Sequence, residues 1–329
     1  MLNNLNILIT GGTGSFGRCF VDLTLKKYKN INLIIYSRDE MKQWEMSNDL
    51  NNDSRVKFVI GDVRDVDRLI QVSRGVDLII HAAATKIVPT AEYNPFECIK
   101  TNINGAMNVI DAAHTNKVKK VIALSTDKAS NPINLYGATK LASDKLFVAA
   151  NYQGLSNTTQ FSIVRYGNVM GSRGSIIPFF LKQKKEGLLT ITDPEMTRFM
   201  ISLEDAVSLV IHALDDMLGG EIYIKKIPSM KLIDIADAIA PKAEKKIIGI
   251  RPGEKLHEQM ISIDDSSSTY EYDSFYKILP MIHDIYMDAN RIKDGTKVNS
   301  KFQYLSNLNN EWMTKETLQD WISKNLNDE

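Results

Sequence analysis

A tyrosine and a lysine, Tyr136 and Lys140, stand four positions apart in a segment with helical character. One helical turn separates such residues, so both side chains project from the same side of a helix. A tyrosine phenolate accepts the proton of an alcohol, and a nearby ammonium lowers the pKa of the phenol by stabilising the anion. Such pairs are common, and an exposed helical turn is the alternative interpretation. By itself the pair indicates alcohol oxidation only weakly.

Three further polar residues, Thr126, Asp127 and Lys128, come shortly before this pair and directly after an apolar run. A hydroxyl holds a substrate oxygen, while a carboxyl and an amine deliver and remove protons. The alternative interpretation is a solvated pair of opposite charges at the end of a strand. The types and order of these residues favour acid–base chemistry next to the tyrosine.

A glycine-rich segment, with Gly11, Gly14 and Gly17, lies between a short apolar run and an amphipathic one. Glycines at this spacing allow a tight turn, close approach of the backbone to a pyrophosphate and tight helix packing. Peptide N–H groups at the start of the following helix then face the diphosphate. A glycine-rich turn without a ligand is the alternative, and the position between the first strand and first helix disfavours it. Together with the polar residues above, the motif predicts hydride transfer at an alcohol or sugar carbon.

The residues that end the second predicted strand, Ser37, Arg38 and Asp39, indicate which nucleotide binds. A site for NAD usually ends this strand with Asp or Glu, which accepts hydrogen bonds from the ribose 2′-hydroxyl. A hydroxyl followed by a guanidinium instead suits the 2′-phosphate of NADP. A solvated arginine, with Asp39 serving NAD, is the alternative. The predicted NADP site comprises Thr10, Gly11, Thr13, Gly14, Ser15, Phe16, Gly17, Ser37, Arg38, Asp39, Lys42, Asp62, Val63, Ala82, Ala83, Ala84, Tyr136 and Lys140.

Short β-branched runs alternate with longer amphipathic runs through the first half of the chain. The pattern predicts strands at residues 6–10, 32–36, 56–60, 76–82, 120–125 and 161–166, with helices such as 16–27 and 103–116 between them. This alternation predicts βαβ units and a doubly wound parallel sheet, an α/β fold of the Rossmann type. Ligands of such folds bind at the carboxyl ends of the strands, where the polar residues above are expected.

The pattern changes after residue 166, where glycines and prolines become frequent. We expect residues 1–166 to form the NADP-binding domain, and residues 201–228 to return to it as a helix and a strand. Residues 167–200 and 229–329 are expected to form a smaller C-terminal α/β lobe that binds the substrate.

Composition excludes several classes of protein. The 40 Lys and Arg residues balance 40 Asp and Glu residues, so no overall field favours nucleic acid or an anionic membrane. Two cysteines far apart, Cys19 and Cys98, favour a reducing cytoplasm over a disulfide-rich secreted fold. No apolar run approaches the roughly 20 residues that span a bilayer, and the histidines show no metal-site spacing. We therefore expect a cytoplasmic protein without nucleic acid, membrane or metal partners.

These motifs together resemble the extended short-chain dehydrogenase/reductase family that acts on nucleotide sugars. More narrowly, the chain is similar to the inverting UDP-N-acetylglucosamine 4,6-dehydratases that open the pseudaminic acid pathway. The segments that carry the resemblance are residues 10–17, 37–40, 126–128, 136–140, 165–169, 171–175, 196–199 and 251–255. The resemblance implies NADP, a UDP-sugar substrate and a homo-oligomer, while the C-terminal part of the chain carries little that is diagnostic.

The resemblance also implies a stereochemical outcome and a set of substrate contacts. Retaining dehydratases carry Glu where Lys128 stands, so Lys128 implies inversion at C5. The implied substrate-binding residues are Lys86, Asn168, Arg173, Arg198, Arg251 and Glu254. Arginine pairs well with diphosphate oxygens, and a carboxylate accepts hydrogen bonds from two ribose hydroxyls. A structural salt bridge or a surface position is the alternative for each.

The reaction itself requires three separate proton transfers. Oxidation at C4 acidifies the C5 proton, a base removes it, the protonated C6 hydroxyl leaves, and the hydride returns to C6. Tyr136, tuned by Lys140, is the predicted base at the C4 hydroxyl, and Thr126 hydrogen-bonds the C4 oxygen. Asp127 and Lys128 form the acid–base pair for C6 and C5. A lysine base must be neutral, so the pKa of Lys128 must be depressed by burial or by the positive charges of the nicotinamide and Lys140.

Two other functions use the same cofactor motif. A UDP-sugar 4-epimerase needs the tyrosine and the lysine at position 140 but has no use for an acid–base pair beside Thr126. A non-catalytic NADP-binding regulator has no need of Tyr136 or Lys140, and this chain keeps both.

Overall fold

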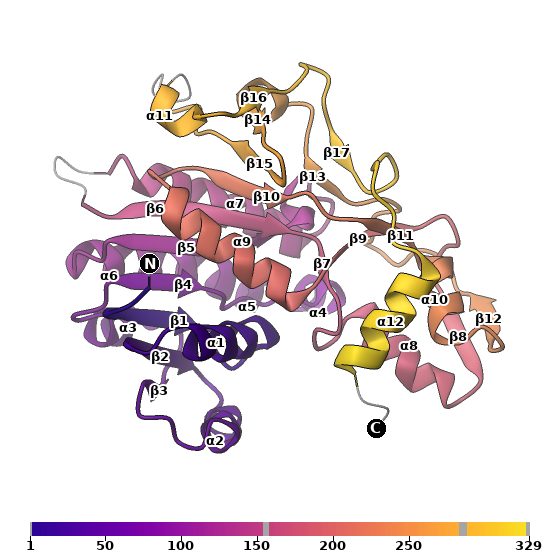
Figure 1. Ribbon diagram of the computed structural model, residues 1–329, viewed down its shortest axis with the longest axis horizontal. Helices are drawn as coiled ribbons and strands as arrows, with labels where there is room; N and C mark the ends of the chain where they lie inside the picture. Colours follow the sequence, from indigo (N-terminus) through magenta and orange to yellow (C-terminus); the bar gives the residue numbers. More distant parts are fainter. Residues whose placement is uncertain (1, 154–157, 283–287, 327–329) are drawn as a thin grey trace.

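The computed structural model describes residues 2–153, 158–282 and 288–326. Within these ranges a ten-stranded sheet runs through the molecule, with helices on both faces (Figure 1). From edge to edge its strand order is β3-β2-β1-β4-β5-β6-β10-β15-β14-β16. The strands are β1 Leu5–Thr10, β2 Ile31–Ser37, β3 Val56–Ile60, β4 Leu78–His81, β5 Lys120–Thr126, β6 Gln160–Tyr166, β10 Ile222–Lys225, β14 Thr269–Glu271, β15 Phe275–Ile278 and β16 Thr296–Lys297.

The strands from β3 to β10 pair in parallel, as the sequence predicts. The strand order reverses at β1, which lies between β2 and β4. In doubly wound folds the ligand binds above such a reversal, at the carboxyl ends of the strands. The predicted Rossmann-type fold is confirmed.

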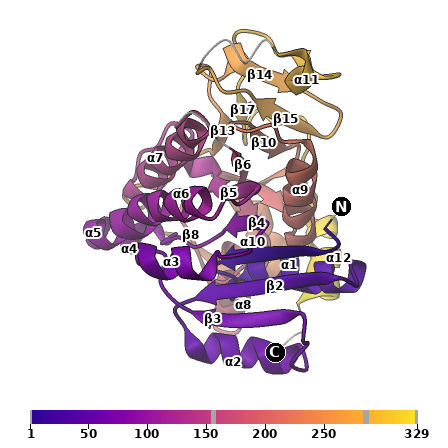
Figure 2. The same cartoon turned by 90° about the vertical axis from the view of Figure 1, so that its left-hand side faces the viewer.

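Two groups of helices cover the sheet, and the strands supply apolar side chains to both. Ile7 and Ile9 of β1 belong to the core under one face, whereas Leu8 belongs to the core under the other. This continuous apolar pattern is typical of parallel strands buried on both sides. Helices α1 and α9 lie on one side, and α3, α6 and α7 on the other (Figure 2). These helices are α1 Ser15–Lys27, α3 Val66–Val72, α6 Gly105–Thr115, α7 Leu135–Ala150 and α9 Leu203–Asp216; α2 Glu40–Asp49 follows β2.

The predicted helix at residues 103–116 corresponds to α6, and the connection that leads to it from β4 is irregular. It contains α4 Val88–Tyr93, α5 Pro95–Ile99 and a π-helical turn, Lys100–Asn104, before α6. Asn102 in that turn is buried, and its side chain hydrogen-bonds both the N–H and the carbonyl of Thr85. The turn therefore ties the loop after β4 to the helical layer.

A smaller lobe lies beyond the carboxyl ends of the strands and has an apolar core of its own. Leu189, Phe180 and Ile235 are fully buried in that core, and Leu318 joins it from the C-terminal part of the chain. The lobe contains β7 Asn168–Val169, α8 Ile176–Lys184, β8 Leu188–Ile191, β9 Thr197–Ile201, β11 Ser229–Lys231, α10 Leu232–Ile239, β12 Glu244–Ile247 and α12 Lys315–Asn325.

The predicted division of the chain differs from the sheet pairing in one region. Residues 229–329 were expected in the smaller lobe, but β14, β15 and β16 extend the main sheet in antiparallel order beyond β10. Tyr276 and Ile278 pack there against the core of the large domain, so these strands cover an otherwise open sheet edge. Strands of two to four residues leave too short a pattern for the sequence to predict this pairing. Two more short strands, β13 Gln259–Ile261 and β17 Tyr304–Leu305, pair with each other, and α11 spans Ala289–Ile292.

Across the described ranges, no helix combines the length and the apolar character needed to span a bilayer. The same residues bring together no group of three or more His, Cys, Asp or Glu side chains that could hold a metal ion.

Candidate active site

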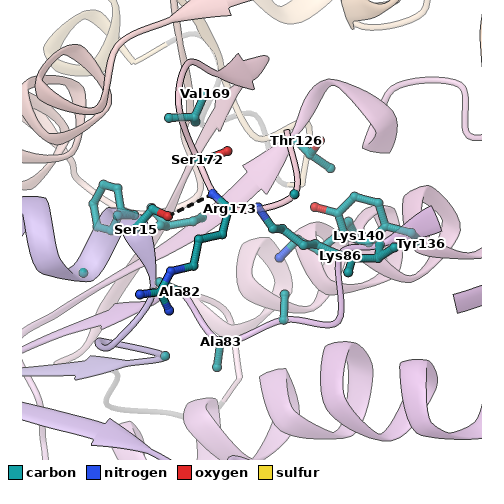
Figure 3. A pocket seen from close by; sticks show the side chains of 18 of the residues that line it. Ser15, Ala82, Ala83, Lys86, Thr126, Tyr136, Lys140, Val169, Ser172 and Arg173 are labelled. Atoms are coloured by element: carbon teal, nitrogen blue, oxygen red, sulfur yellow. Dashed lines mark hydrogen bonds between the residues drawn. The ribbon is translucent and has the colours of Figure 1, made fainter. Parts of the chain in front are cut away.

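A cavity of about 900 Å³ opens at the carboxyl ends of the central strands. Figure 3 shows Lys86, Tyr136 and Lys140 gathered on one side of it, opposite Ser15 and Arg173. Every residue predicted from the sequence to bind cofactor or substrate, or to act in catalysis, lines this cavity except Thr10 and Arg198. Segments far apart in the chain therefore meet at one site.

The glycine-rich segment forms a cradle that leaves no room for side chains. Gly11 has a φ of +66°, and a Cβ there would lie 2.8 Å from the backbone of Ala83. A Cβ on Gly17 would lie 2.2 Å from the carbonyl oxygen of Gly12. Gly14 begins α1 without a side-chain cap, so the N–H groups of the first turn open toward the cavity. This cradle fits the diphosphate of a dinucleotide.

Thr10 lies beneath this cradle instead of on the cavity wall, contrary to the prediction. Its side chain is fully buried and its hydroxyl lies 2.8 Å from Nδ1 of His81. The same hydroxyl accepts a hydrogen bond from the N–H of Ala83. Thr10 therefore fixes the loop after β4 under the glycine segment, because its hydroxyl contacts His81 and Ala83 instead of the cavity.

The end of β2 presents Ser37, Arg38, Asp39 and Lys42 to the cavity. Asp39 caps α2 by accepting a hydrogen bond from the N–H of Lys42, and its carboxylate lies 2.6 Å from the Lys42 ammonium. These contacts hold the pKa of Asp39 below its usual value. Arg38 is 62% exposed and lies 3.6 Å from Asp62. Ser37 accepts a hydrogen bond from Gln43, which leaves its own hydroxyl proton for an acceptor in the cavity.

The end of β5 places three of the predicted catalytic groups in direct contact. Thr126 ends the strand, and its hydroxyl donates to Oδ1 of Asp127 at 2.9 Å. The Lys128 ammonium donates to the same oxygen at 3.1 Å. Asp127 is only 1% exposed, and burial raises the pKa of its carboxyl against the opposing effect of Lys128. The other oxygen of Asp127 is buried without a hydrogen-bond partner among the described residues, and Asp127 lines the cavity.

Helix α7 carries Tyr136 and Lys140, and it is capped by Asn134, whose side chain accepts a hydrogen bond from the N–H of Gly137. Burial raises the pKa of Tyr136 to about 12, although the Lys128 ammonium and a hydrogen bond with Thr126 lower it. Lys140, which the sequence predicts to tune this phenol, lies on the same helix and lines the same cavity, and Lys128 is a second cation that acts on Tyr136. Lys140 is 3% exposed, and burial lowers its pKa while Asp144 raises it.

The charge state of Lys128 also differs from the prediction. Burial lowers the pKa of its amine, but the carboxylates of Asp127 and Glu258 outweigh burial and the net shift is upward. Two carboxylates next to the amine therefore favour its ammonium form in the ligand-free protein. Glu258 was not predicted as a site residue, yet its Oε1 lies 2.9 Å from the Lys128 amine. Nothing in the local sequence distinguishes Glu258 from the other acidic residues of the chain.

The predicted substrate-binding residues divide into two groups. Lys86, Asn168, Arg173, Arg251 and Glu254 line the cavity. The Arg251 guanidinium lies 3.9 Å from Glu254, whose Oε2 is buried without a hydrogen-bond partner among the described residues. The main-chain N–H of Arg173 donates to the Ser15 hydroxyl, which closes the loop over the cofactor cradle.

Arg198 lies behind the cavity wall, contrary to its predicted contact with substrate. Its guanidinium donates to the carbonyl of Thr197 at 2.8 Å, and its Nε lies 3.6 Å from Glu258. Strand β9 turns this side chain toward β13, so Arg198 supports the residues behind Lys128. The cavity lining also includes residues that the sequence reasoning missed, among them Thr101, Leu124, Tyr166, Val169 and Ser172.

Comparison with known proteins places the chain among enzymes of sugar-nucleotide metabolism. A family model described as polysaccharide biosynthesis protein matches residues 7–280. The chain is 56% identical to a UDP-N-acetylglucosamine 4,6-dehydratase (inverting) of Campylobacter jejuni, with 98% of each chain covered. It is 45% identical to a UDP-glucose 4-epimerase of Rickettsia bellii, with 84% of each covered. The resemblance stated from the motifs is confirmed.

A solved structure agrees with the sequence relatives. The X-ray structure of Pen from Bacillus thuringiensis matches with a TM-score of 0.89 and 35% identity, and covers 98% of this chain and 99% of that one. Since the family model spans most of the chain and the relatives cover nearly all of it, the chain belongs to the polysaccharide biosynthesis protein family.

Proposed function

We propose that this protein catalyses the NADP-dependent 4,6-dehydration of UDP-N-acetylglucosamine with inversion at C5. The observation that carries the proposal is the contact between Asp127 and Lys128, 3.1 Å apart, in the same cavity as Tyr136. A cavity with one tyrosine base suffices for oxidation and reduction at a single carbon. The additional acid–base pair supplies the two proton transfers that loss of water requires.

Binding of the nucleotide sugar brings C4 to Tyr136. Arg173 and Arg251 pair with the diphosphate, and the Glu254 oxygen that no described residue hydrogen-bonds accepts a hydrogen bond from a ribose hydroxyl. Tyr136, as its phenolate, takes the proton of the C4 hydroxyl, while Thr126 holds the C4 oxygen. Lys140 lies on the same side of α7 and stabilises the phenolate once the site is closed to water. NADP, when bound, accepts the hydride from C4 and gives it back at C6.

Elimination of water uses Asp127 and Lys128 in the opposite protonation states from those of the ligand-free protein. Transfer of one proton from the Lys128 ammonium to Asp127, across 3.1 Å, gives a neutral amine and a carboxylic acid without changing the total charge. The amine then removes the C5 proton, and the acid protonates the C6 hydroxyl, which leaves as water. A proton from solvent, delivered to the other face of C5, gives the 4-keto-6-deoxy-L-arabino sugar, and Tyr136 releases to solvent the proton that it took from the C4 hydroxyl. The pair ends as ammonium and carboxylate, ready for the next turnover.

The end of β2 supports NADP as the cofactor. Asp39 is engaged with the first turn of α2, whereas Ser37 and Arg38 present a hydroxyl and a guanidinium to the cavity. These groups suit the 2′-phosphate of NADP, which an NAD site has no need to bind.

Replacing Arg38 with alanine is expected to weaken NADP binding about tenfold, and to leave NAD binding within about twofold. The effect stays at the low end for a charged hydrogen bond because the side chain is largely exposed. Titration of both nucleotides, followed by protein fluorescence or calorimetry, measures it. Arg74→Ala, at an exposed position outside the cavity, is the matched control. Equal loss for NAD and NADP would contradict the assignment.

The main alternative is a UDP-sugar 4-epimerase, and a relative that is 45% identical carries that name. Such an enzyme returns the hydride to C4 and never loses water, so it leaves the Asp127–Lys128 contact without a role. A non-catalytic NADP-binding regulator leaves Tyr136 and Lys140 without one as well.

Incubation with UDP-N-acetylglucosamine in D2O, without added cofactor, separates these functions. We expect loss of one water, deuterium at C5 and inverted configuration there, observed by NMR and mass spectrometry. Appearance of the C4 epimer without water loss would establish the epimerase. No product from any UDP-hexose, in protein that retains NADP, would establish the regulator.

The same proposal places the protein in the cytoplasm as a homo-oligomer that supplies pseudaminic acid or a related surface glycan. The 4-keto product calls for a following amino-transfer or reduction at C4. Sedimentation of the purified protein measures the oligomeric state.

A further inference from the structure

Glu258 lies directly behind the proposed acid–base pair. It precedes β13, and its side chain is only 1% exposed. Its Oε1 lies 2.9 Å from the Lys128 amine and 3.6 Å from Nε of Arg198. Glu258 does not line the cavity, so it faces Lys128 from the side away from the substrate.

Several contacts fix Glu258 against the catalytic turn. Its main-chain N–H donates to the Ser306 hydroxyl at 2.9 Å, and its carbonyl accepts the N–H of Ser306 at the same distance. On either side of it, Lys255 donates to the carbonyl of Ser130, and Gln259 accepts from Asn131. The segment that leads into β13 is therefore docked on the residues that follow Asp127, and the carboxylate has little freedom to move.

The charged groups around Lys128 determine when the Glu258 carboxylate matters for proton transfer. The charged and titratable side chains that act on Lys128, or on which it acts, are Asp127, Glu258, Arg198, Tyr136, Lys86 and Lys255. Asp127 must become neutral when it holds the proton destined for the C6 hydroxyl. Glu258 is then the carboxylate that remains in contact with the amine.

We propose that Glu258 is a positioning residue for Lys128, which holds the amine beside Asp127 and sets how strongly it binds the proton taken from C5. This inference rests on the proposed function for its catalytic meaning, but the contact between the two side chains does not. A buried carboxylate next to an amine stabilises the ammonium form, so Lys128 is a stronger base than an isolated buried lysine. Arg198 balances the charge of Glu258 and keeps the carboxylate ionised.

The first test follows the protonation state of the Lys128 amine by NMR, in the absence of turnover. In protein labelled with 13C-lysine, the Lys128 resonance is identified by its absence from Lys128→Ala. We expect it to keep its ammonium position in the wild type up to the highest pH that the fold tolerates. In Glu258→Gln it is expected to titrate at a pH lower by about one unit or more, because a negative charge has been removed. The same titration in both proteins would overturn the proposal, whatever the enzyme is found to catalyse.

The second test measures the consequence for catalysis. In Glu258→Gln the rising limb that the coupled Asp127–Lys128 pair contributes to the kcat profile is expected to move to lower pH, because the pair loses its excess proton more readily without the neighbouring negative charge. Maximal kcat is expected to fall at least about threefold, because a weaker base removes the C5 proton more slowly. KM for the UDP-sugar should stay within about twofold, since Glu258 does not touch the cavity. An unmoved limb, or a rise in KM with unchanged kcat, would overturn the proposal.

Two further variants separate positioning from folding. Glu254→Gln, in the same segment but on the cavity wall, is the matched control and is expected to raise KM while leaving the limb in place. Glu258→Asp keeps the charge and withdraws the oxygens from Lys128. The rising limb of its kcat profile is expected to stay at the wild-type pH while maximal kcat falls. This variant provides the test if Glu258→Gln does not fold. If the rising limb of the kcat profile shifts as far in Glu258→Asp as in Glu258→Gln, the negative charge of Glu258 does not set the proton affinity of Lys128, and the proposal is overturned.

Discussion

Replacing Lys128 with alanine is expected to lower kcat for water loss by about 10²- to 10⁴-fold, the range of a lost general base. The variant has no amine at the end of β5 to remove the C5 proton, and Asp127 alone offers a carboxyl already required at C6. Incorporation of deuterium at C5 in D2O should fall in parallel. Product NMR and mass spectrometry measure both quantities in one sample.

The control for this variant is Lys86→Ala, which removes another lysine from the same cavity wall. It is expected to raise KM and to leave deuterium incorporation per turnover unchanged, because Lys86 contacts substrate without taking the C5 proton. Near-normal C5 exchange in Lys128→Ala would assign the base to another residue. It would also remove the main reason for preferring dehydration to epimerisation.

Replacing Tyr136 with phenylalanine is expected to lower kcat by about 10²- to 10⁴-fold, with KM within a few-fold of the wild type. The phenol takes the proton of the C4 hydroxyl, and the ring alone preserves the packing against Ala91 and Cys98. Steady-state assays over a range of substrate concentrations measure the split between kcat and KM. The pKa of Tyr136, raised to about 12 without ligand, further predicts that kcat/KM of the wild type rises with pH, because kcat/KM reports the groups of the free enzyme.

Tyr166→Phe is the matched control, because Tyr166 is a second tyrosine of the cavity wall. Its kcat is expected to change by no more than about threefold. Comparable losses in both variants would mean that removal of either hydroxyl disturbs the site as a whole. The Tyr136 and Lys128 variants also separate the candidate functions, because a 4-epimerase would lose activity with Tyr136→Phe and keep it with Lys128→Ala.

The charge of Lys128 links these predictions to the geometry. A base must be neutral, and the sequence alone suggested that burial, Lys140 and the nicotinamide would depress its pKa. The structure adds two carboxylates at 2.9 and 3.1 Å, and these raise the pKa instead. The proposed transfer of a proton to Asp127 reconciles an ammonium at rest with an amine during elimination. It requires that Asp127 and Lys128 be studied as one coupled pair.

Local sequence determined much of this protein. The spacing of Gly11, Gly14 and Gly17 prescribes a tight turn before a helix, and one helical turn brings Tyr136 and Lys140 to one side of α7. The alternation of apolar runs determined the doubly wound sheet, because each short run must be buried on both faces. Both kinds of signal lie within a few consecutive residues, so no knowledge of distant contacts is needed to interpret them.

Only the tertiary structure decided which charged groups meet behind the cavity wall. Glu258 and Lys128 are far apart in the chain, and their contact depends on how the segment before β13 docks on the turn after β5. Arg198 points to Glu258 and not into the cavity because of the direction in which β9 presents it. The antiparallel strands beyond β10 likewise follow from an open sheet edge and not from a local pattern. Proton affinities sum the burial and charges contributed by several segments, so they are set only when the chain has folded.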